Sequence, residues 1–312
     1  MAQVLFLVPD DLGEAVLATG ALAYALRDGG DVSIVTTADA APLFRAVPGR
    51  IETRLIGKGV LDPAATWAGL AGKRFQVLLD GRAGLLGSTL SAAQRIALQP
   101  GPVIRHRVED WAAAFGADHS LAPTLALDAA ARDAAATKAP GEGVMLVLAP
   151  GGASAAKRWP ADRFAAVARR LCDGELAAAR VVVLGAAARD ADITRGIVSS
   201  LDADGIAAID LGRGIDLLGA AALLERATLC IGNDNALTHI AAAMGAPTLT
   251  LFGPTDERVR APYGARARTL RGRSFEEAAT AADLDAGAAM ADVSIDAVEA
   301  AALDLLHAGG LR

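Results

Sequence analysis

The chain has 312 residues, of which 53% are hydrophobic, and it carries a formal net charge of −6 at pH 7 with a sequence pI near 5.3. A chain of this length and composition can bury ample core and predicts two globular domains. The acidic balance argues against a nucleic-acid-binding protein, because such proteins usually present a basic face.

The cysteines and the start of the chain indicate where the protein resides. Cys172 and Cys230 lie far apart inside apolar segments, which favours buried free thiols in a reducing compartment over a disulfide. The apolar run at the start covers only residues 4–8 and has no basic segment before it. It is too short for a signal peptide or a membrane span, so we expect a cytoplasmic location.

Both halves of the sequence alternate between short apolar runs and helical patterns, which predicts βαβ units and parallel sheets. In the first half the segments are 4–9, 14–28, 32–38, 50–57, 76–82 and 89–96. In the second half the apolar runs are 144–150, 179–186, 206–212, 228–233 and 248–254, and the helices are 161–173, 216–227 and 236–246. The predicted fold class is therefore α/β.

The Ala-rich segment 127–143 separates the two halves. It ends in Pro140, Gly141 and Gly143, which indicates a helix followed by a linker. We therefore place an N-terminal domain at 1–140 and a C-terminal domain at 141–312. The second domain closes with a helix at about 294–308, which has a serine at its N-cap and glycines after its end.

The first candidate loop holds Asp10, Asp11 and Glu14 after the strand at 4–8. Ligands of doubly wound folds bind beyond the carboxyl ends of the strands, which is where this loop is expected. Acidic residues there fit a capped helix start, because the helix dipole favours them. They fit a catalytic carboxylate equally well, and the residues alone leave both interpretations open.

The second candidate loop, 149–160, places a glycine turn before Lys157. It is not a Walker A loop, because Ala156 and Arg158 stand where that motif needs a glycine and a metal-binding Ser or Thr. Pro160, expected at the first position of the next helix, fixes the entry angle and aims Lys157 over the strand ends. The alternative is an exposed lysine in an ordinary turn.

The third candidate loop follows the strand at 228–233. We expect Gly232 to make a tight turn there. Asp234 or Asn235 should cap a helix whose free N–H groups and positive dipole form an anion site. His239 lies one turn into that helix, where a half-buried histidine bonded to backbone is the alternative to a role at the ligand.

Three motifs together resemble the ADP-heptose:lipopolysaccharide heptosyltransferase family, glycosyltransferase family 9. They are KRWP after the glycine turn, GNDNALTHIAAAMGAPTLTLFGPTDERVRAPYG from the third loop onward, and DDLGEAVLATGAL near the start. The resemblance spans nearly the whole chain. It implies a GT-B fold of two Rossmann-like domains whose parallel sheets face a central cleft, with the acceptor on 1–140 and the donor on 141–312. In many members the final helix, here about 294–308, packs back on the N-terminal domain.

The resemblance also implies the residues of the site. The implied donor-binding residues are Lys157, Asp190, Asp234, Asn235, Ala236 and His239. Asp234 is implied to bind sugar hydroxyls, while Asn235 and Ala236 offer backbone N–H groups to the phosphates. His239 is implied to brace the turn or touch phosphate, and we assign Asp190 to the ribose.

The resemblance implies further residues on the acceptor side. The general base corresponds to Glu14, with Asp10 and Asp11 as alternatives. An acceptor that carries phosphates or carboxylates would need basic residues on the first domain, and the candidates are Arg105, His106 and Arg107. A solvated loop is the alternative interpretation of those three residues.

The implied reaction is an inverting, metal-independent transfer of heptose from an ADP-heptose-like donor to a lipopolysaccharide-core or related glycan acceptor. A lysine and a helix N-terminus can stabilise the diphosphate leaving group without a metal ion or another cofactor. The Asp-x-Asp pairs at 190/192, 202/204 and 283/285 are poor indicators of a metal site, because nothing else clusters with them. A lipid acceptor would bring the protein to the inner face of the inner membrane, and nucleic acid is not an expected partner.

Two positions depart from the family pattern. Glu14 stands where the family usually has Asp, which moves the carboxylate out by one methylene. Ala236 stands in place of a glycine and adds a Cβ where the backbone approaches phosphate. Both changes favour, as the alternative function, a nucleotide-sugar-binding protein with altered or lost transferase activity. A dinucleotide oxidoreductase is disfavoured, because no G-x-G-x-x-G motif opens either half.

Overall fold

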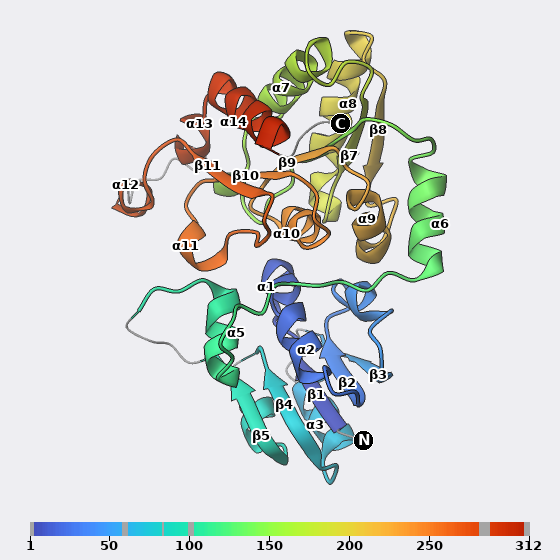
Figure 1. Ribbon diagram of the computed structural model, residues 1–312, viewed down its shortest axis with the longest axis vertical. Coiled ribbons are helices and arrows are strands. Elements are labelled where there is room, and N and C mark those ends of the chain that lie inside the picture. The colour runs from blue at the N-terminus through green and yellow to red at the C-terminus, as the bar shows by residue number, and fades with distance from the viewer. Residues whose placement is uncertain (1–2, 58–61, 83, 99–102, 281–287, 309–312) are drawn as a thin grey trace. The chain divides into compact units, whose positions relative to one another are not determined.

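The computed structural model describes residues 3–57, 62–82, 84–98, 103–280 and 288–308. The chain forms two compact units, which are residues 1–128 together with 258–260, and residues 129–257 together with 261–312. Each unit is built on its own parallel sheet with helices packed against it (Figure 1).

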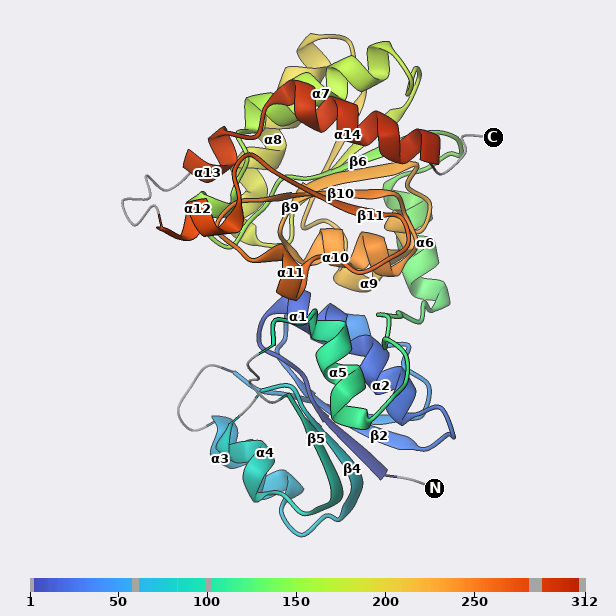
Figure 2. The same cartoon turned by 60° about the vertical axis from the view of Figure 1, so that its left-hand side comes forward.

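The first unit contains a five-stranded sheet in the order β3-β2-β1-β4-β5. Its strands are β1 (Gln3–Leu7), β2 (Asp31–Thr36), β3 (Arg50–Leu55), β4 (Phe75–Asp80) and β5 (Ala92–Ala97). Its helices are α1 (Leu12–Leu17), α2 (Thr19–Ala25), η1 (Ala41–Phe44), α3 (Asp62–Leu70), α4 (Leu85–Thr89) and α5 (Arg107–Phe115). Figure 2 shows α2 and α5 on one side of this sheet, with α3 and α4 on the other.

The order of the strands brings two loops of the first unit together. β1 pairs in parallel with β2 on one side and with β4 on the other. The chain therefore winds away from β1 in both directions, and the loops that leave β1 and β4 emerge side by side. In doubly wound folds this is the point where ligands bind. The two strands are held in place by fully buried side chains, which include Leu5, Leu7 and Leu78.

The second unit contains a six-stranded sheet in the order β11-β10-β9-β6-β7-β8. Its strands are β6 (Met145–Ala149), β7 (Arg180–Leu184), β8 (Ala208–Gly212), β9 (Leu229–Asn233), β10 (Thr248–Phe252) and β11 (Ala267–Arg271). The helices after residue 128 are α6 (Ala129–Lys138), η2 (Ala155–Lys157), α7 (Ala161–Asp173), η3 (Ala188–Asp190), α8 (Ala191–Ala203), α9 (Leu217–Leu224), α10 (Ala236–Ala243), α11 (Glu257–Arg260), α12 (Phe275–Thr280), α13 (Ala288–Ala291) and α14 (Ile295–Ala308). Here the winding reverses between β6 and β9, so the loops after these two strands are neighbours.

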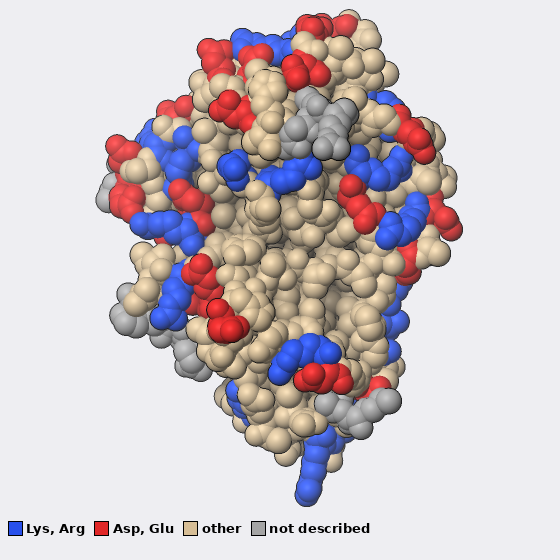
Figure 3. Space-filling view, viewed as in Figure 1, with Lys and Arg blue, Asp and Glu red and all other residues tan. Residues whose placement is uncertain are grey.

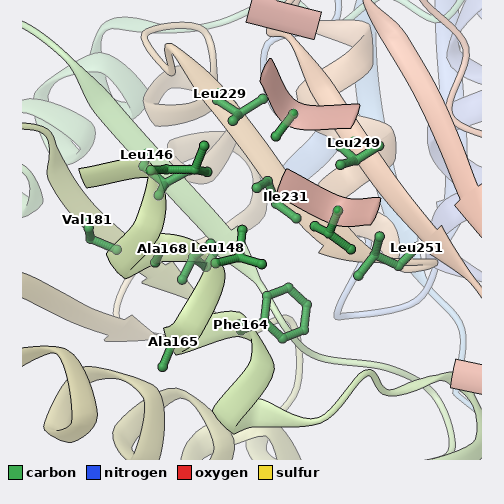
Figure 4. Close-up of a cluster of buried hydrophobic side chains, with 14 of the residues drawn as sticks. Leu146, Leu148, Phe164, Ala165, Ala168, Val181, Leu229, Ile231, Leu249 and Leu251 are labelled. Carbon is green, nitrogen blue, oxygen red and sulfur yellow. The ribbon is translucent and has the colours of Figure 1, made fainter. Parts of the chain in front are cut away.

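A large apolar cluster holds the central strands of the second unit in place. Figure 4 shows side chains of β6, β9 and β10 gathered with Phe164 and Ala168 of α7. Leu148, Ile231 and Leu251 in this cluster have no exposed surface. Burial of one such side chain stabilises the fold by roughly 1.5–3 kcal/mol. The cluster therefore fixes the strands whose carboxyl ends carry the candidate site.

The division between the units lies after residue 128 rather than after residue 140. The physical reason is that α6, which we expected inside the first domain, packs against α9 of the second unit. The final helix also has its core in the second unit, where Val298, Ala302 and Leu305 are buried in the cluster with α7.

Both cysteines are free thiols, and the described helices are too short or too polar to span a membrane. Cys172 and Cys230 are both free, and complete burial raises the pKa of the Cys230 thiol to about 12. Burial also raises the pKa of the Cys172 thiol, so neither is a ready thiolate nucleophile. Within the described ranges, no helix is both long and apolar enough to cross a membrane.

Candidate functional site

The first loop combines a helix cap with a half-buried carboxylate. Asp11 is the N-cap of α1, and its Oδ1 accepts a hydrogen bond of 3.0 Å from the backbone N–H of Glu14. Glu14 lies in the first turn, with only 14% of its side chain exposed. The capped helix start predicted from the sequence is therefore present, and it presents Glu14 at the carboxyl end of β1.

Each carboxylate of this loop faces an arginine. Asp10 Oδ1 lies 2.5 Å from Arg82 Nη2, and 63% of the Asp10 side chain is exposed. Arg82 follows β4, so this pair spans the two neighbouring loops at the reversal of the winding. Asp11 Oδ1 lies 2.8 Å from Arg260 Nη2, in the segment 258–260 that groups with this unit.

Arg107, which we predicted to contact the acceptor, is directed at Glu14. Its Nε donates to Glu14 Oε2 at 2.9 Å, and its Nη1 donates to Asp110 Oδ2 at 3.1 Å. His106 is the N-cap of α5, with its Nδ1 accepting from the Val108 N–H. Of the three predicted acceptor residues, Arg105 alone is largely exposed. Sequence reasoning did not foresee the pairing of Arg107 with Glu14.

In the second unit, the loops after β6 and β9 bring Lys157, Asp234 and His239 together. Lys157 Nζ donates to Asp234 Oδ2 at 2.8 Å, and His239 Nε2 lies 3.8 Å from Asp234 Oδ1. The Asp234 side chain is 5% exposed and that of Lys157 is 22% exposed. This grouping agrees with the sequence prediction that Lys157 points over the strand ends.

The charge of Asp234 is stabilised by these partners. Burial alone would raise the pKa of Asp234, but the nearby His239, together with the charge and hydrogen bond of Lys157, holds it well below its usual range. The carboxylate is therefore ionised at neutral pH. One hydrogen bond thus joins the Asp234 carboxylate, whose oxygens can accept from hydroxyl groups, to the Lys157 cation, which can contact an anion.

The start of α10 provides an organised helix N-terminus. Asn235 is its N-cap, and its side-chain oxygen accepts from the N–H groups of Leu237 and Thr238. Its side-chain amide donates to the carbonyls of Ala149 and Gly151, each at 2.9 Å. Of the two caps that the sequence allowed, Asn235 is the one used, and it also ties α10 to the loop after β6.

Ala236 causes no backbone strain. Ala178 is the one non-glycine residue with a positive φ among those that the structure describes, so the backbone at 236 does not require glycine. The prediction that Gly232 makes a tight turn is wrong, because β9 continues to Asn233. Gly232 is needed for close packing instead, since a Cβ there would lie 2.7 Å from Thr238 Cγ2 and 2.8 Å from the Ala149 oxygen.

Asn233 and Trp159 hold the lysine loop, and sequence reasoning overlooked Asn233. Asn233 is fully buried; its amide donates to the Pro150 carbonyl at 2.6 Å, and its oxygen accepts from the Trp159 N–H at 3.1 Å. The signal was a polar side chain at the end of an apolar strand. Pro160 is the N-cap of α7 rather than its first residue, one position from the expectation.

Asp190 lies in η3 after β7, next to the glycine turn. It is 1% exposed, and its Oδ2 accepts from the N–H groups of Ala186 and Ala187. A Cβ on Gly151 would lie 2.5 Å from that carboxylate oxygen. Asp190 Oδ1 is buried without a hydrogen-bond partner within the described part of the chain. The ribose contact assigned to Asp190 stays a prediction.

The Asp-x-Asp pairs do not gather into a ligand cluster in the described residues. Asp192 is exposed and pairs with Arg195, while Asp204 pairs with Arg169. Asp283 and Asp285 lie outside the described residues. No group of three or more His, Cys, Asp or Glu side chains that could hold a metal ion occurs in the ranges that the structure covers.

The sequence of the chain matches a known family. A family model for glycosyltransferase family 9 (heptosyltransferase) matches residues 79–286. The chain belongs to glycosyltransferase family 9. Lipopolysaccharide heptosyltransferase 2 of Escherichia coli (strain K12) is 31% identical over 117 residues, which cover 37% of this chain and 32% of that protein. The match thus spans about a third of the length of this curated relative.

Solved structures confirm the fold over nearly the whole chain. The E. coli ADP-heptose lipopolysaccharide heptosyltransferase II is 19% identical with a TM-score of 0.76, over 98% of this chain and 99% of that one. A family 9 glycosyltransferase from Veillonella parvula DSM 2008 is 19% identical with a TM-score of 0.81, over 98% of each chain. The predicted α/β fold of GT-B type, with two Rossmann-like domains, is therefore confirmed.

Proposed function

We propose that this family 9 protein is an inverting, metal-independent glycosyltransferase that moves heptose from an ADP-heptose-like donor to a lipopolysaccharide-core or related glycan. The observation that carries the proposal is the contact of Lys157 and His239 with Asp234 beside the capped start of α10. That arrangement offers a cation and a helix N-terminus to a diphosphate. The names of the family and of the E. coli relatives supply the sugar and the acceptor class.

In the proposed reaction an acceptor hydroxyl attacks the anomeric carbon of the donor. A new C–O bond forms on one face of the sugar while the bond to the diphosphate breaks on the other, so the configuration inverts. The hydroxyl proton passes to a carboxylate of the first loop, and the electron pair leaves with the diphosphate. Lys157 and the α10 N–H groups stabilise that charge electrostatically.

We assign the general base to Glu14 rather than to Asp10 or Asp11. Asp11 uses its Oδ1 to cap α1, and Asp10 is mostly exposed. Glu14 is the least exposed of these three carboxylates, so water competes least with a substrate hydroxyl there. A general base has to lie within hydrogen-bond reach of the proton that it takes.

We also propose cytoplasmic residence with peripheral contact at the inner face of the inner membrane. Leu85 and Ile104, which follow β4 and β5, expose 84% and 59% of their surface. On the face shown in Figure 3, outside the grey atoms, Lys and Arg side chains are interspersed with Asp and Glu. We propose that these two exposed apolar side chains make the membrane contact. Co-sedimentation with phosphatidylglycerol vesicles should fall in Leu85→Ser/Ile104→Ser, and absence of wild-type binding would contradict the contact.

The alternative is a nucleotide-sugar-binding protein without transferase activity. It is favoured by one observation, the ion pair that engages the Glu14 carboxylate with Arg107.

Measurements of ligand binding and of turnover separate the two functions. A thermal-shift screen of ADP-, GDP-, UDP- and dTDP-sugars should single out the ADP-sugar, because a ligand at 100 times its Kd adds about 2.7 kcal/mol of stability. Release of ADP that depends on a heptose-deficient core glycan would then establish transfer, and stabilisation without release would favour the binding protein.

A further inference from the structure

Arg107 links the start of α5 to the start of α1. It contacts Glu14 Oε2 through Nε at 2.9 Å and Asp110 Oδ2 through Nη1 at 3.1 Å. The exposed fractions of the side chains are 27% for Arg107, 14% for Glu14 and 22% for Asp110. Because all three are partly shielded from water, their interactions are screened less than those of a surface ion pair.

The position of Arg107 is electrostatically unusual. It is the first residue of α5, where the positive end of the helix dipole disfavours a cation. Asp110 in the same turn and Glu14 from α1 offset that cost. Departures from local preference of this kind occur most often at functional sites. The arginine is therefore better explained by its partners than by the stability of its own helix.

The length of Glu14 fits the arginine. An aspartate on the same backbone would withdraw the carboxylate by one C–C bond, about 1.5 Å, and the 2.9 Å contact with Arg107 Nε would open beyond hydrogen-bond range. The glutamate that departs from the family pattern is thus the side chain that reaches Arg107. The two residues behave as a matched pair.

We propose that Arg107 is a positioning residue, which holds the Glu14 carboxylate through Oε2, and that Asp110 in turn fixes Arg107. This inference rests on the proposed function. With Oε2 engaged, Oε1 is the oxygen that takes the proton of the acceptor hydroxyl. Arg260 Nε faces this oxygen at 3.8 Å. A displacement of about 1 Å in such a group lowers turnover about 10²-fold, so the pairing sets the rate without binding the acceptor.

A double-mutant cycle on the full chain tests this role. The probes are ADP-heptose and a heptose-deficient lipopolysaccharide core glycan. Arg107→Gln should lower kcat by about 10- to 100-fold and change the KM for the glycan by less than about threefold. In a Glu14→Asp background the same substitution should change kcat by less than about threefold, because the shorter side chain of that variant cannot reach Arg107. Equal losses in both backgrounds with a raised glycan KM would mean that Arg107 binds the acceptor directly, and would overturn the inference.

Two further variants keep the test independent of folding. Asp110→Asn should lower kcat in the wild-type background but not in Glu14→Asp, and it replaces the cycle if Arg107→Gln fails to fold. Arg45→Gln, which breaks the more exposed pair of Arg45 with Asp128 in the same unit, should leave kcat unchanged. An inactive wild type would refute the proposed function and this inference together, whereas additive losses in an active wild type would refute the inference alone.

Discussion

Lys157 and Asp234 place opposite charges in the proposed donor site, whose ligand is an anion. A diphosphate repels the Asp234 carboxylate, yet Asp234 holds Lys157 Nζ at 2.8 Å and keeps it from swinging into solvent. His239 Nε2 lies 3.8 Å from the other oxygen of the carboxylate. The lysine is thus pre-positioned, so little side-chain entropy is lost when phosphate binds.

Replacement of Lys157 should weaken donor binding and leave the fold intact. Lys157→Ala removes a charge-assisted hydrogen bond worth roughly 1.5–3 kcal/mol, which corresponds to about 10- to 150-fold in the Kd for ADP. Titration calorimetry with ADP measures the change. Lys138→Ala removes an exposed lysine at the end of α6 and is the matched control. Equal ADP affinity in Lys157→Ala and wild type would remove Lys157 from the site.

The lowered pKa of Asp234 predicts a pH-dependent contribution to stability. A carboxyl with a lower pKa in the folded than in the unfolded chain stabilises the fold above its unfolded value, near 3.9. That contribution disappears as the pH falls through the folded value. Burial opposes the lowered pKa of Asp234, and His239 and Lys157 produce it.

The thermal midpoint of wild type should therefore exceed that of Asp234→Asn most clearly at pH 5 and above. The difference should shrink steadily as the pH is lowered from about 5 towards 2. Scanning calorimetry at a series of pH values measures it. A difference that stays constant over this interval would show that the ionised carboxylate does not contribute to stability through its two partners.

At the scale of elements, one side chain ties the start of α10 to the loop after β6. Asn235 caps the helix through its oxygen and holds the loop after β6 through its nitrogen. Loss of an N-cap costs about 1 kcal/mol, and each lost hydrogen bond about 1 kcal/mol more. Asn235→Ala should therefore destabilise the protein by about 2–3 kcal/mol and weaken ADP binding as well.

A second helix cap provides the control for this prediction. Asp216 caps α9 in the same unit, where its Oδ1 accepts from the Gly219 N–H at 2.7 Å. Asp216→Ala should lower the thermal midpoint without changing the Kd for ADP. If Asn235→Ala loses stability but binds ADP like wild type, the start of α10 is not part of the donor site.

The sequence predicted the elements better than the contacts between their side chains. Alternating apolar runs and helical patterns indicate parallel sheets, and the reversal of winding explains why the loops carrying Lys157 and Asp234 meet. The predicted helix 14–28 is instead broken after Leu17. Thr19 bonds back to the Val16 carbonyl, and a Cβ on Gly20 would lie 2.1 Å from the Leu121 oxygen. That close approach cannot be deduced from a local pattern.

The pairing of Arg107 with Glu14 was missed for the same reason. The two residues are 93 positions apart in the chain, and their contact depends on how α5 packs beside α1. Charge and periodicity identified both residues as candidates but gave no information on which partner each would face. The predicted boundary after residue 140 likewise differs from the division after residue 128, because the packing of α6 on α9 leaves no mark in composition.

At the scale of the whole molecule, the proposed chemistry requires no metal ion. In the proposed reaction, Lys157 and the α10 N-terminus supply the positive charge that Mg²⁺ supplies in other nucleotide-sugar enzymes. Transfer of heptose in about 5 mM EDTA, an excess over trace metal, should proceed at the rate without EDTA. Measurement of ADP release in both buffers checks this. A rate that collapses in EDTA and recovers with Mg²⁺ would mean that the leaving group is stabilised in another way.

The division into two units predicts that donor binding and base catalysis can be separated by mutation. Glu14 belongs to the first unit and the Lys157 cluster to the second. Glu14→Gln should thus leave the Kd for ADP within about twofold of wild type. It should lower turnover by about 10²- to 10⁴-fold, the usual range for loss of a general base. Glu109→Gln, at an exposed position in the first turn of α5, is the matched control and should change neither.

Substitution of the other two carboxylates of the first loop tests whether Glu14 is the general base. Asp11→Asn keeps a residue that can cap α1, so any loss of turnover reports on its charge rather than on the helix. Asp10→Asn removes the charge that pairs with Arg82. Turnover that survives Glu14→Gln and disappears in one of these two variants would move the base to that aspartate. If wild type and all three variants bind ADP but none transfers heptose, the first loop holds no working base, and the chain is the binding protein that Ala236 and Glu14 first suggested.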